Sequence, residues 1–472
     1  MKYTHPPSRL FQNLTAVAVT SLFVVSMGCA TNPVTGKNEF LLTSESKEIQ
    51  TGEEHFPVAR EAGGGTLSTD PALSEYVKEV GIRITEVSDR PNLPYEFIII
   101  NSSQPHAWAL PGGKIAVTRG LLVLLENEGQ LASVLSHQIV HAAAKHRAKA
   151  LERSTMKTVA VTAVALGATV VGIPAFPLIG MVSRKEPTHH WLIHSAHSED
   201  EEIEADRYGM EYMYRAGYDP KHAVDTLRVL GRRESELTPE QEERTLFAAH
   251  PLSRKRTAAT RIRAYQHEKH PGPAPPPPQD RYAERIALLR TAAPAYATAD
   301  ASRNRLNEGD YDSALILIRE ARKAVPQEAR FRETEGDVLM MQHHFHEAYQ
   351  SYDEAVRLRP DRFSAWLGRG MASKALGDTE NARADFEISY RLFPNRLAAD
   401  ELYDHVYRPK QKPTKDSAPA EKAPAEDTDD PDSPAFAARH PDELADEAAP
   451  ILSVHPGSED AAAAPLLSES AP

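Results

Sequence analysis

The sequence has a single cysteine, Cys29, in 472 residues, so a disulfide bond within the chain is impossible. It also lacks an excess of positive charge, because its formal net charge at pH 7 is −13. From Gln411 onward 14 acidic residues stand against 4 basic ones, a net of −10, which leaves −3 for the rest of the chain. A nearly neutral body with an acidic end argues against nucleic acid as a partner.

Charge is also absent from residues 158–183, a run of 26 positions. The run is long enough to span a membrane. It consists mainly of Ala, Gly, Thr and Val, however, and Pro174 and Pro177 interrupt it. We expect amphipathic or loop structure here that covers the candidate site described below, with a membrane-inserted hairpin as the alternative.

The first 29 residues have the pattern of a targeting segment. Lys2 and Arg9 give a positive start, and an apolar run from Leu14 to Met27 leads through Gly28 to Cys29. A lone cysteine after such a run indicates a lipoprotein that is acylated at Cys29, with Ala30 favouring the outer membrane. A plain cleaved signal or an uncleaved anchor is the alternative.

The next part, residues 30–90, reads as a stalk followed by helices. Tyr95–Ile100 and Lys114–Thr118 are rich in β-forming residues and are predicted to be strands. Pro111-Gly112-Gly113 breaks the chain between them, which predicts a hairpin-like pairing of the two strands. Glu128 to about Arg153 is predicted to be one helix.

That helix carries two histidines, His137 and His141, four residues apart. This spacing is about one helical turn, so both imidazoles project from one face and can hold a single metal ion. The zinc-protease motif is His-Glu-x-x-His, in which the glutamate is the general base. Here the second position of the motif is Gln138.

A zinc peptidase needs a third protein ligand and an open position for water. Glu202 is the best candidate, in a segment from Glu201 to Ala216 whose pattern is helical. Asp206 follows four residues later on the same face and could accept a ring N–H from a ligand histidine. Four histidines precede this segment, and they are either extra ligands or a polar loop near the cleft: His189, His190, His194 and His197.

Pro271 to Pro278 is a stiff, proline-rich linker, and an internal repeat follows it. Residues at equivalent positions recur every 34 residues: Pro326, Pro360 and Pro394; Ala314, Ala348 and Ala382; Ala321, Ala355 and Ser389. The spacing resembles the tetratricopeptide repeat, whose paired helices form a concave surface for a peptide or a helix. Past Lys410 the Pro, Ala, Glu and Asp composition predicts a disordered tail.

From Pro91 to about Ala264 the chain resembles the HtpX/BepA type of gluzincin metallopeptidase. The matching stretches are Pro91-Asn-Leu-Pro-Tyr, Ala107-Trp-Ala-Leu-Pro-Gly-Gly, Gly120-Leu-Leu, Leu131–His146, Glu202–Gly209, Ala216-Gly-Tyr-Asp-Pro220 and His250-Pro-Leu. Lipoprotein members also have a start similar to Cys29-Ala-Thr-Asn-Pro-Val-Thr-Gly, and tetratricopeptide tails occur in the type. The resemblance implies a zinc endopeptidase of envelope quality control.

Carried onto this chain, the resemblance implies that His137, His141 and Glu202 bind one Zn²⁺ and that Asp206 orients a ligand. His250 matches a histidine that can approach the metal in outer-membrane-assembly members, either as a latch that keeps the enzyme latent or as a transition-state contact. Gln138 stands at the position of the general base.

Three residues depart from the family pattern, which has glutamate at Gln138, asparagine at His106 and arginine at Glu199. An amide cannot take up a proton near neutral pH, and loss of a general base costs roughly 10²–10⁴ in rate. Together the three changes indicate drift to a non-catalytic, metal-binding form. The rival accounts are that Gln138 was introduced, or that a carboxylate among Glu199, Glu201 and Glu204 has become the base.

The sequence therefore predicts an α+β, mainly helical fold: a gluzincin-type domain with an active-site helix beside a small sheet, followed by an all-α repeat domain. The predicted segments are a signal to Cys29, a stalk with helices (30–90), a metallopeptidase-like domain (91–265), a linker (266–294), three repeats (295–400) and an acidic tail (408–472).

The expected function is that of a zinc metalloendopeptidase-like lipoprotein with weak or absent proteolysis. The alternative is a non-catalytic pseudo-peptidase that serves as a chaperone or scaffold. Under either function, the expected partners of the protein are unfolded or misassembled envelope proteins, a protein bound to the repeats, and a membrane reached through the lipid anchor. We expect it at the periplasmic face of the outer membrane, with the inner membrane as the less favoured location.

Overall fold

The computed structural model describes residues 29–41, 43–154, 196–236, 249–268, 281–394 and 396–407. Several expectations fall outside these residues: the signal segment before Cys29, the uncharged run 158–183, three of the loop histidines (His189, His190 and His194), and the tail 408–472. Within the described residues, no helix is long and apolar enough to cross a bilayer.

The described chain is α+β and mainly helical, as predicted, and its sheets are small. The strands are β1 (Cys29–Thr31) and β2 (Asn38–Phe40), which form an antiparallel pair, and β3 (Glu96–Ile100), β4 (Ala107–Leu110) and β5 (Lys114–Thr118). The last three form one sheet in the order β3-β5-β4.

The expected hairpin between β3 and β5 is wrong. These two strands pair in parallel, with Phe97 opposite Ile115, and the antiparallel partner of β5 is β4. A 3₁₀ turn, η1 (Pro111–Gly113), links β4 to β5, and Gly112 takes a φ of 74° there. Strand β4 was missed because all four of its residues are buried, so its sequence, Ala-Trp-Ala-Leu, shows no alternation of apolar and polar residues.

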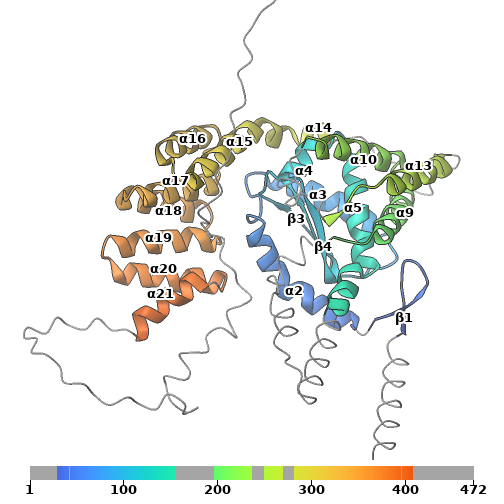
Figure 1. Cartoon of the computed structure of the whole chain (residues 1–472), viewed down its shortest axis with the longest axis horizontal. Coiled ribbons are helices and arrows are strands. Elements are labelled where there is room, and N and C mark those ends of the chain that lie inside the picture. Colours follow the sequence, from blue (N-terminus) through green and yellow to red (C-terminus); the bar gives the residue numbers. More distant parts are fainter. Residues whose placement is uncertain are drawn as a thin grey trace, which may run out of the picture.

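Most of the helices that precede the linker surround the sheet. The described helices of this part are α2 (Glu45–Ala62), α3 (Pro71–Thr85), α4 (Arg119–Leu124), α5 (Glu128–Ala143), α9 (Glu199–Arg215), α10 (Lys221–Glu234) and α13 (Arg254–Glu268). Helix α5 lies between the sheet on one side and α9 and α10 on the other (Figure 1). All sixteen of its residues are buried, so its polar side chains must find partners within the protein.

The predicted single helix from Glu128 to Arg153 is broken. Helix α5 ends at Ala143, and Lys145 has a φ of 59°, in the left-handed region that lysine rarely adopts. A second helical stretch then begins at His146 and runs to 154 within the described residues. Lys145 lies 3.5 Å from Glu48 on α2, and Glu48 in turn pairs with Arg90 at 3.0 Å, so the turn is anchored by buried charges.

The 34-residue periodicity corresponds to paired antiparallel helices, as predicted. They are α15 (Ala287–Asn307) with α16 (Tyr311–Ala324), α17 (Ala329–Met341) with α18 (Phe345–Leu358), and α19 (Phe363–Ala375) with α20 (Thr379–Leu392), followed by α21 (Arg396–Tyr407). The recurring alanines Ala314, Ala348 and Ala382 are fully buried, because they lie where neighbouring helices approach most closely.

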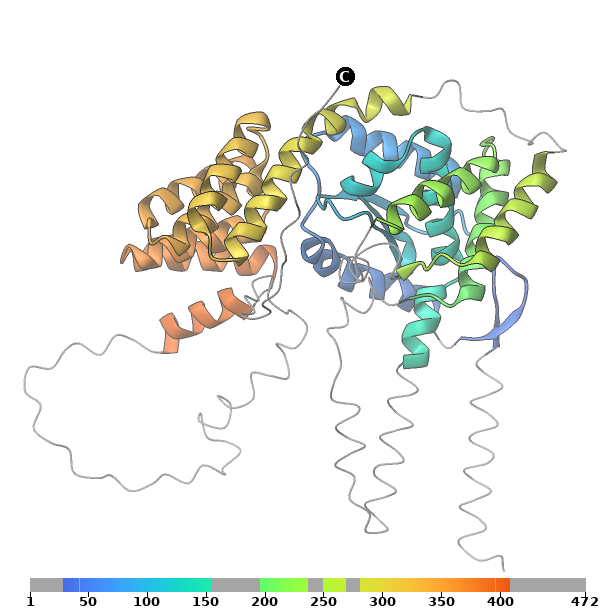
Figure 2. The same cartoon turned by 45° about the horizontal axis from the view of Figure 1, so that its top comes forward.

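The repeats pack beside the sheet-containing part of the chain (Figure 2). Arg362, at the start of α19, pairs with the buried Glu333 on α17 and also donates to the carbonyl oxygen of Gly64 at 3.4 Å. Asn101, just after β3, donates to Glu328 at 3.0 Å. The predicted linker 266–294 is shorter than expected, because α14 (Tyr282–Arg285) and the start of α15 already lie within it.

Acid should weaken the Arg362–Glu333 pair. Burial raises the pKa of Glu333, but the charge and hydrogen bonds of Arg362 outweigh it, so the net pKa lies below the usual glutamate range. The pair therefore contributes stability above the unfolded pKa of about 4.3 and loses it as the pH falls further. Urea midpoints measured from pH 7 to 3 should fall more steeply below pH ~4.3 in the parent than in Glu333→Gln.

The matched control for this pair is Glu347→Gln, since Glu347 makes an exposed ion pair with Arg319 at 3.4 Å. Its pH profile should follow that of the parent protein. If Glu333→Gln also follows the parent, the buried pair does not govern acid stability.

Helix α9 lies close to α5 at Gly209. A Cβ there would lie 3.2 Å from the His137 backbone nitrogen and 3.3 Å from Ser136 Oγ. Gly209→Val should therefore force the two helices apart and lower the free energy of unfolding by about 1–3 kcal/mol. Gly231→Val is the control, because a Cβ at Gly231 meets only Leu252 at an ordinary 3.7 Å. Equal urea midpoints for the two variants would contradict the close approach.

Candidate metal centre

Helix α5 brings His137 and His141 together, as their spacing predicts. Their rings meet edge to face with centroids 4.6 Å apart, and the two Nε2 atoms are 2.9 Å apart. Apolar side chains on the other faces of α5, among them Leu131, Leu135 and Ile139, belong to the main core. The core therefore fixes the direction in which both imidazoles point.

Helix α9 supplies the two carboxylates that the sequence singled out. Ser198 and Glu201 form a capping box at its start, which fixes where the first turn begins. Glu202 is fully buried, and its oxygens lie 3.4 Å from the Nε2 atoms of both His137 and His141. Asp206, one turn later, accepts from His137 Nδ1 at 2.8 Å.

His250 lies just before α13 and closes the group. Its Nδ1 is 2.8 Å from Glu202 Oε1 and 3.3 Å from His137 Nε2. His137, His141, Glu202 and His250 are all buried, and each offers a ligand atom within 4.8 Å of the others. The structure thus brings together the three predicted ligands His137, His141 and Glu202, and His250 completes this cluster.

The donor set and spacing fit a metal ion. Ligand atoms around a tetrahedral zinc ion with bonds of 2.0–2.1 Å lie about 3.3 Å apart. The four donor atoms here are separated by 2.8 to 3.4 Å along the contacts described above. Imidazole nitrogen combined with carboxylate oxygen is a donor set typical of zinc enzymes. The four residues therefore form a cradle that a small divalent cation would fill.

The charge states of His141, Glu202 and Asp206 suit a cation. For His137, burial lowers the pKa, but Glu202 and Asp206 outweigh it and raise the net pKa above its usual value. Burial holds the pKa of His141 well below the usual range, so its ring is neutral at pH 7. Burial raises the pKa of Glu202, but His250, Arg256 and His137 outweigh it and keep the carboxylate ionised. Burial likewise opposes ionisation of Asp206, yet Arg256 and His137 lower its pKa to about 2. Neutral imidazole and ionised carboxylate are the forms that bind metals.

Arg256 on α13 was missed by sequence reasoning. It lies 2.8 Å from Glu202 Oε2, and its Nε and Nη2 donate to the Asp206 oxygens at 2.7 and 3.0 Å. Its Nη1 also donates to the His250 carbonyl oxygen at 3.2 Å. No signal in the sequence separates Arg256 from Arg254 or Lys255, because only the fold decides which of the three faces inward.

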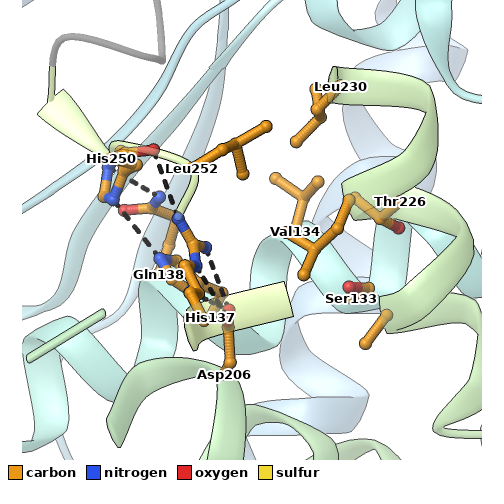
Figure 3. Close-up of a pocket in the computed structure, with 12 residues that line it drawn as sticks. Ser133, Val134, His137, Gln138, Asp206, Thr226, Leu230, His250 and Leu252 are labelled. Carbon is orange, nitrogen blue, oxygen red and sulfur yellow. Dashed lines mark hydrogen bonds and ion pairs between the residues drawn. The ribbon is translucent and has the colours of Figure 1, made fainter. Parts of the chain in front are cut away.

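Gln138 points its amide toward the cluster (Figure 3). Its Nε2 lies 3.2 Å from His250 Nε2, and its Oε1 is buried without a hydrogen-bond partner among the described residues. The amide can donate to His250 but cannot take up a proton. The side chain therefore offers the cluster a hydrogen-bond donor but no group that takes up a proton at neutral pH.

The three carboxylates considered as substitute bases are engaged elsewhere. Glu199 is exposed and pairs with Lys255 at 3.2 Å, so it does not face the cluster as its sequence position suggested. Glu201 bonds Arg153 at 2.9 Å. Glu204 lies 3.1 Å from His146 Nε2. The remaining departure, His106, is buried at the start of β4, where its backbone nitrogen donates to Thr118 Oγ1 at 2.9 Å.

Two further histidines adjoin the cluster. His197, from the predicted polar loop, lies over His141 with centroids 3.9 Å apart, and its Nε2 accepts from Arg147 at 3.0 Å. His146, at the start of the second helical stretch, lies with its Nδ1 2.9 Å from His141 Nδ1. Helical spacing on one helix could not reveal this contact, because it depends on the turn at Lys145.

A pocket opens beside the cluster, between α5, α10 and Leu252 (Figure 3). Val134, Leu227 and Leu230 supply apolar side chains, while His137 and Gln138 form the polar end. An apolar side chain of a bound polypeptide would therefore find a pocket next to the candidate metal ligands.

The comparisons with known proteins agree with this geometry. Residues 71–264 match the model of peptidase family M48. The Escherichia coli beta-barrel assembly-enhancing protease is 29% identical over 269 residues, which are 55% of this chain and 53% of that protein. The mitochondrial metalloendopeptidase OMA1 of Schizosaccharomyces pombe is 29% identical over 232 residues, 48% of this chain and 63% of that protein.

The chain thus spans about half the length of the beta-barrel assembly-enhancing proteases that it matches. Among solved structures, the first TPR of Spaghetti (RPAP3) bound to an HSP90 peptide aligns with 24% identity and a TM-score of 0.24. That alignment covers 24% of this chain and 91% of that one.

Removal of Arg256 should be strongly destabilising. Arg256→Leu leaves the carboxylates of Glu202 and Asp206 buried without their cation, and breaking a buried pair typically costs about 3–5 kcal/mol. Urea unfolding of the metal-free protein measures the loss. Arg254→Leu is the control, because Arg254 lies on the exposed side of the same helix, and its midpoint should match the parent. If the two variants unfold alike, Arg256 does not hold the cluster together.

Proposed function

Because residues 71–264 belong to peptidase family M48, we propose that this chain binds one zinc ion through His137, His141 and Glu202. The observation that carries the proposal is the convergence of these three side chains in a buried cluster, with Asp206 fixing the ring of His137. Two imidazoles and a carboxylate, supported by a second carboxylate, are the ligand set of catalytic zinc sites in helical peptidases.

The function supported best is that of a zinc metalloendopeptidase-like protein whose proteolysis is weak or absent. A zinc ion bound there would polarise a substrate carbonyl and lower the pKa of a water molecule. The protein must then move a proton from that water to the leaving amine. Gln138 stands where this proton carrier is needed, and its amide has no basic site at neutral pH. Three nearby carboxylates, Glu199, Glu201 and Glu204, do not take its place, because each is paired with another residue.

A second function, a non-catalytic binding module, is favoured by the position of His250. Structural zinc sites have four protein ligands, whereas catalytic sites keep one position open. His250 lies close enough to join His137, His141 and Glu202 as a fourth donor. In that state the site would be closed, and the apolar pocket beside it would serve to hold a non-native client rather than to cut it.

The substrates or clients that we propose are unfolded or misassembled envelope proteins. The name of the Escherichia coli relative, a beta-barrel assembly-enhancing protease, supports this class. The paired helices from α15 to α20 would bind a protein partner, in keeping with the role of such repeats. Acylation of Cys29 would tether the chain to the periplasmic face of the outer membrane. The segment before Cys29 lies outside the described residues, so this part of the proposal rests on the sequence.

A digestion assay on casein separates the two functions. Gln138→Glu should gain roughly 10²–10⁴ in rate over the parent, because a carboxylate restores the proton carrier. His137→Ala and the double variant His137→Ala/Gln138→Glu should be inactive. Cleavage by the parent at a rate equal to Gln138→Glu would overturn the weak-proteolysis proposal. If Gln138→Glu binds zinc but does not cleave casein, the binding module is favoured.

A further inference from the structure

The pair His146 and Glu204 has no place in the function proposed above, although His146 is 1% exposed and lies directly behind a proposed ligand. Its Nδ1 is 2.9 Å from His141 Nδ1, and its Nε2 is 3.1 Å from Glu204 Oε1. A line of hydrogen bonds thus runs from helix α9 through one imidazole to another.

The protons along this line can be assigned from the contacts alone. The Nε2 of His141 faces His137 and Glu202, so its lone pair must be free if it binds a metal. The proton of that neutral ring then lies on Nδ1 and is donated to His146 Nδ1. His146 therefore carries its own proton on Nε2, which it donates to the Glu204 carboxylate. Every donor meets an acceptor in this one arrangement.

We infer that His146 is a positioning residue, which together with Glu204 holds the His141 ring with its Nε2 lone pair toward the metal. The inference rests on the proposed metal binding. His137 is held in the same way by Asp206, through a single hydrogen bond to its Nδ1. Helix α9 thus supplies one ligand, Glu202, the acceptor Asp206 for His137, and the acceptor Glu204 for His146.

The turn at Lys145 supports this role, because it places His146 between His141 and Glu204, where it can form a hydrogen bond with each. Had α5 continued as a regular helix, residues five apart would not face each other. A left-handed φ on a non-glycine residue is strained, so the surrounding structure must hold it in place. The ion pair of Lys145 with Glu48, itself held by Arg90, provides that hold.

A second metal site made of His141, His146 and His197 is the rival account, since their nitrogens also lie within 4.8 Å of one another. Two contacts oppose it. Arg147 donates to His197 Nε2, which places a positive charge beside the group. The facing nitrogens of His141 and His146 are at hydrogen-bond distance and have complementary protons, so no ion is needed between them.

The test is the affinity of the metal-free, full-length chain for Zn²⁺, measured by competition with a chromophoric chelator. His146→Leu should bind Zn²⁺ 10–100-fold more weakly than the parent, which is the usual effect of removing the partner of a ligand histidine. His146→Asn should bind within a few-fold of the parent, because its amide oxygen can accept from His141 Nδ1. A residue that only filled space would not be rescued by the smaller, polar asparagine.

Glu204→Leu is the second variant, since Glu204 lies near the surface and its loss leaves the core intact. It should weaken binding less than His146→Leu but measurably. His346→Leu, on the exposed face of α18, is the control for the loss of any histidine and should match the parent. Far-UV circular dichroism of the metal-free forms checks that all variants are folded.

The outcomes distinguish this inference from the function that it rests on. If the parent binds one Zn²⁺ and both His146→Leu and Glu204→Leu bind it equally well, the positioning role is wrong while the metal site stands. If the parent binds no Zn²⁺, or binds it no better than His137→Ala, both the proposed function and the positioning role fail. Binding of a second Zn²⁺ that His146→Leu abolishes would overturn the inference in favour of the rival site.

Discussion

The burial of Glu202 is the constraint on which the rest of the site depends. A carboxylate without solvent exposure is stable in its ionised form only if cations and hydrogen-bond donors surround it. Arg256 supplies a permanent positive charge on one side, and three imidazoles converge on the other. The imidazoles of His137 and His141 come from α5, and His250 and Arg256 come from the start of α13 and the segment before it, so α5, α9 and α13 must meet at this point. The core packing of α5 and the close approach at Gly209 are the means by which they do so.

The burial of Glu202 also determines how the residue at position 138 affects the cluster. A glutamate at this position would add another negative charge beside Glu202 and would compete for His250. The amide instead donates to His250 and leaves the ring free to contact Glu202 through Nδ1. Gln138 therefore bears on the hydrogen bonding of His250 as well as on proton transfer. The cluster has the donor atoms that a cation needs, and the Gln138 amide adds no group that takes up a proton.

The sequence predicted those parts of the molecule whose geometry is local. His137 and His141, or Glu202 and Asp206, lie on one helix, so a spacing of four sets their relative positions. The 34-residue period of the alanines likewise predicted paired helices, because each pair repeats the same close contact. In contrast, β4 is too short and too evenly apolar to show a strand period, and the parallel pairing of β3 with β5 depends on it.

Arg256 and His146 could not be found in this way for a similar reason. Arg256 differs from its basic neighbours only in facing α9, which depends on how three helices pack. His146 reaches His141 only because Lys145 adopts a left-handed conformation that ordinary helix propensity disfavours. Its partner Glu204 then lies fifty-eight residues away along the chain. The contacts of Arg256 and of His146 thus depend on tertiary structure. Both residues lie around the proposed ligands and are not part of the sequence motif.

We propose that one metal ion is held by His137, His141 and Glu202. Anomalous diffraction from crystals of the zinc-loaded chain, recorded at the zinc absorption edge, tests it most directly. We expect one strong peak, about 2.0–2.2 Å from the Nε2 atoms of His137 and His141 and from a carboxylate oxygen of Glu202. A fully loaded crystal with no peak at this position, or with its peak between His141, His146 and His197, would contradict it.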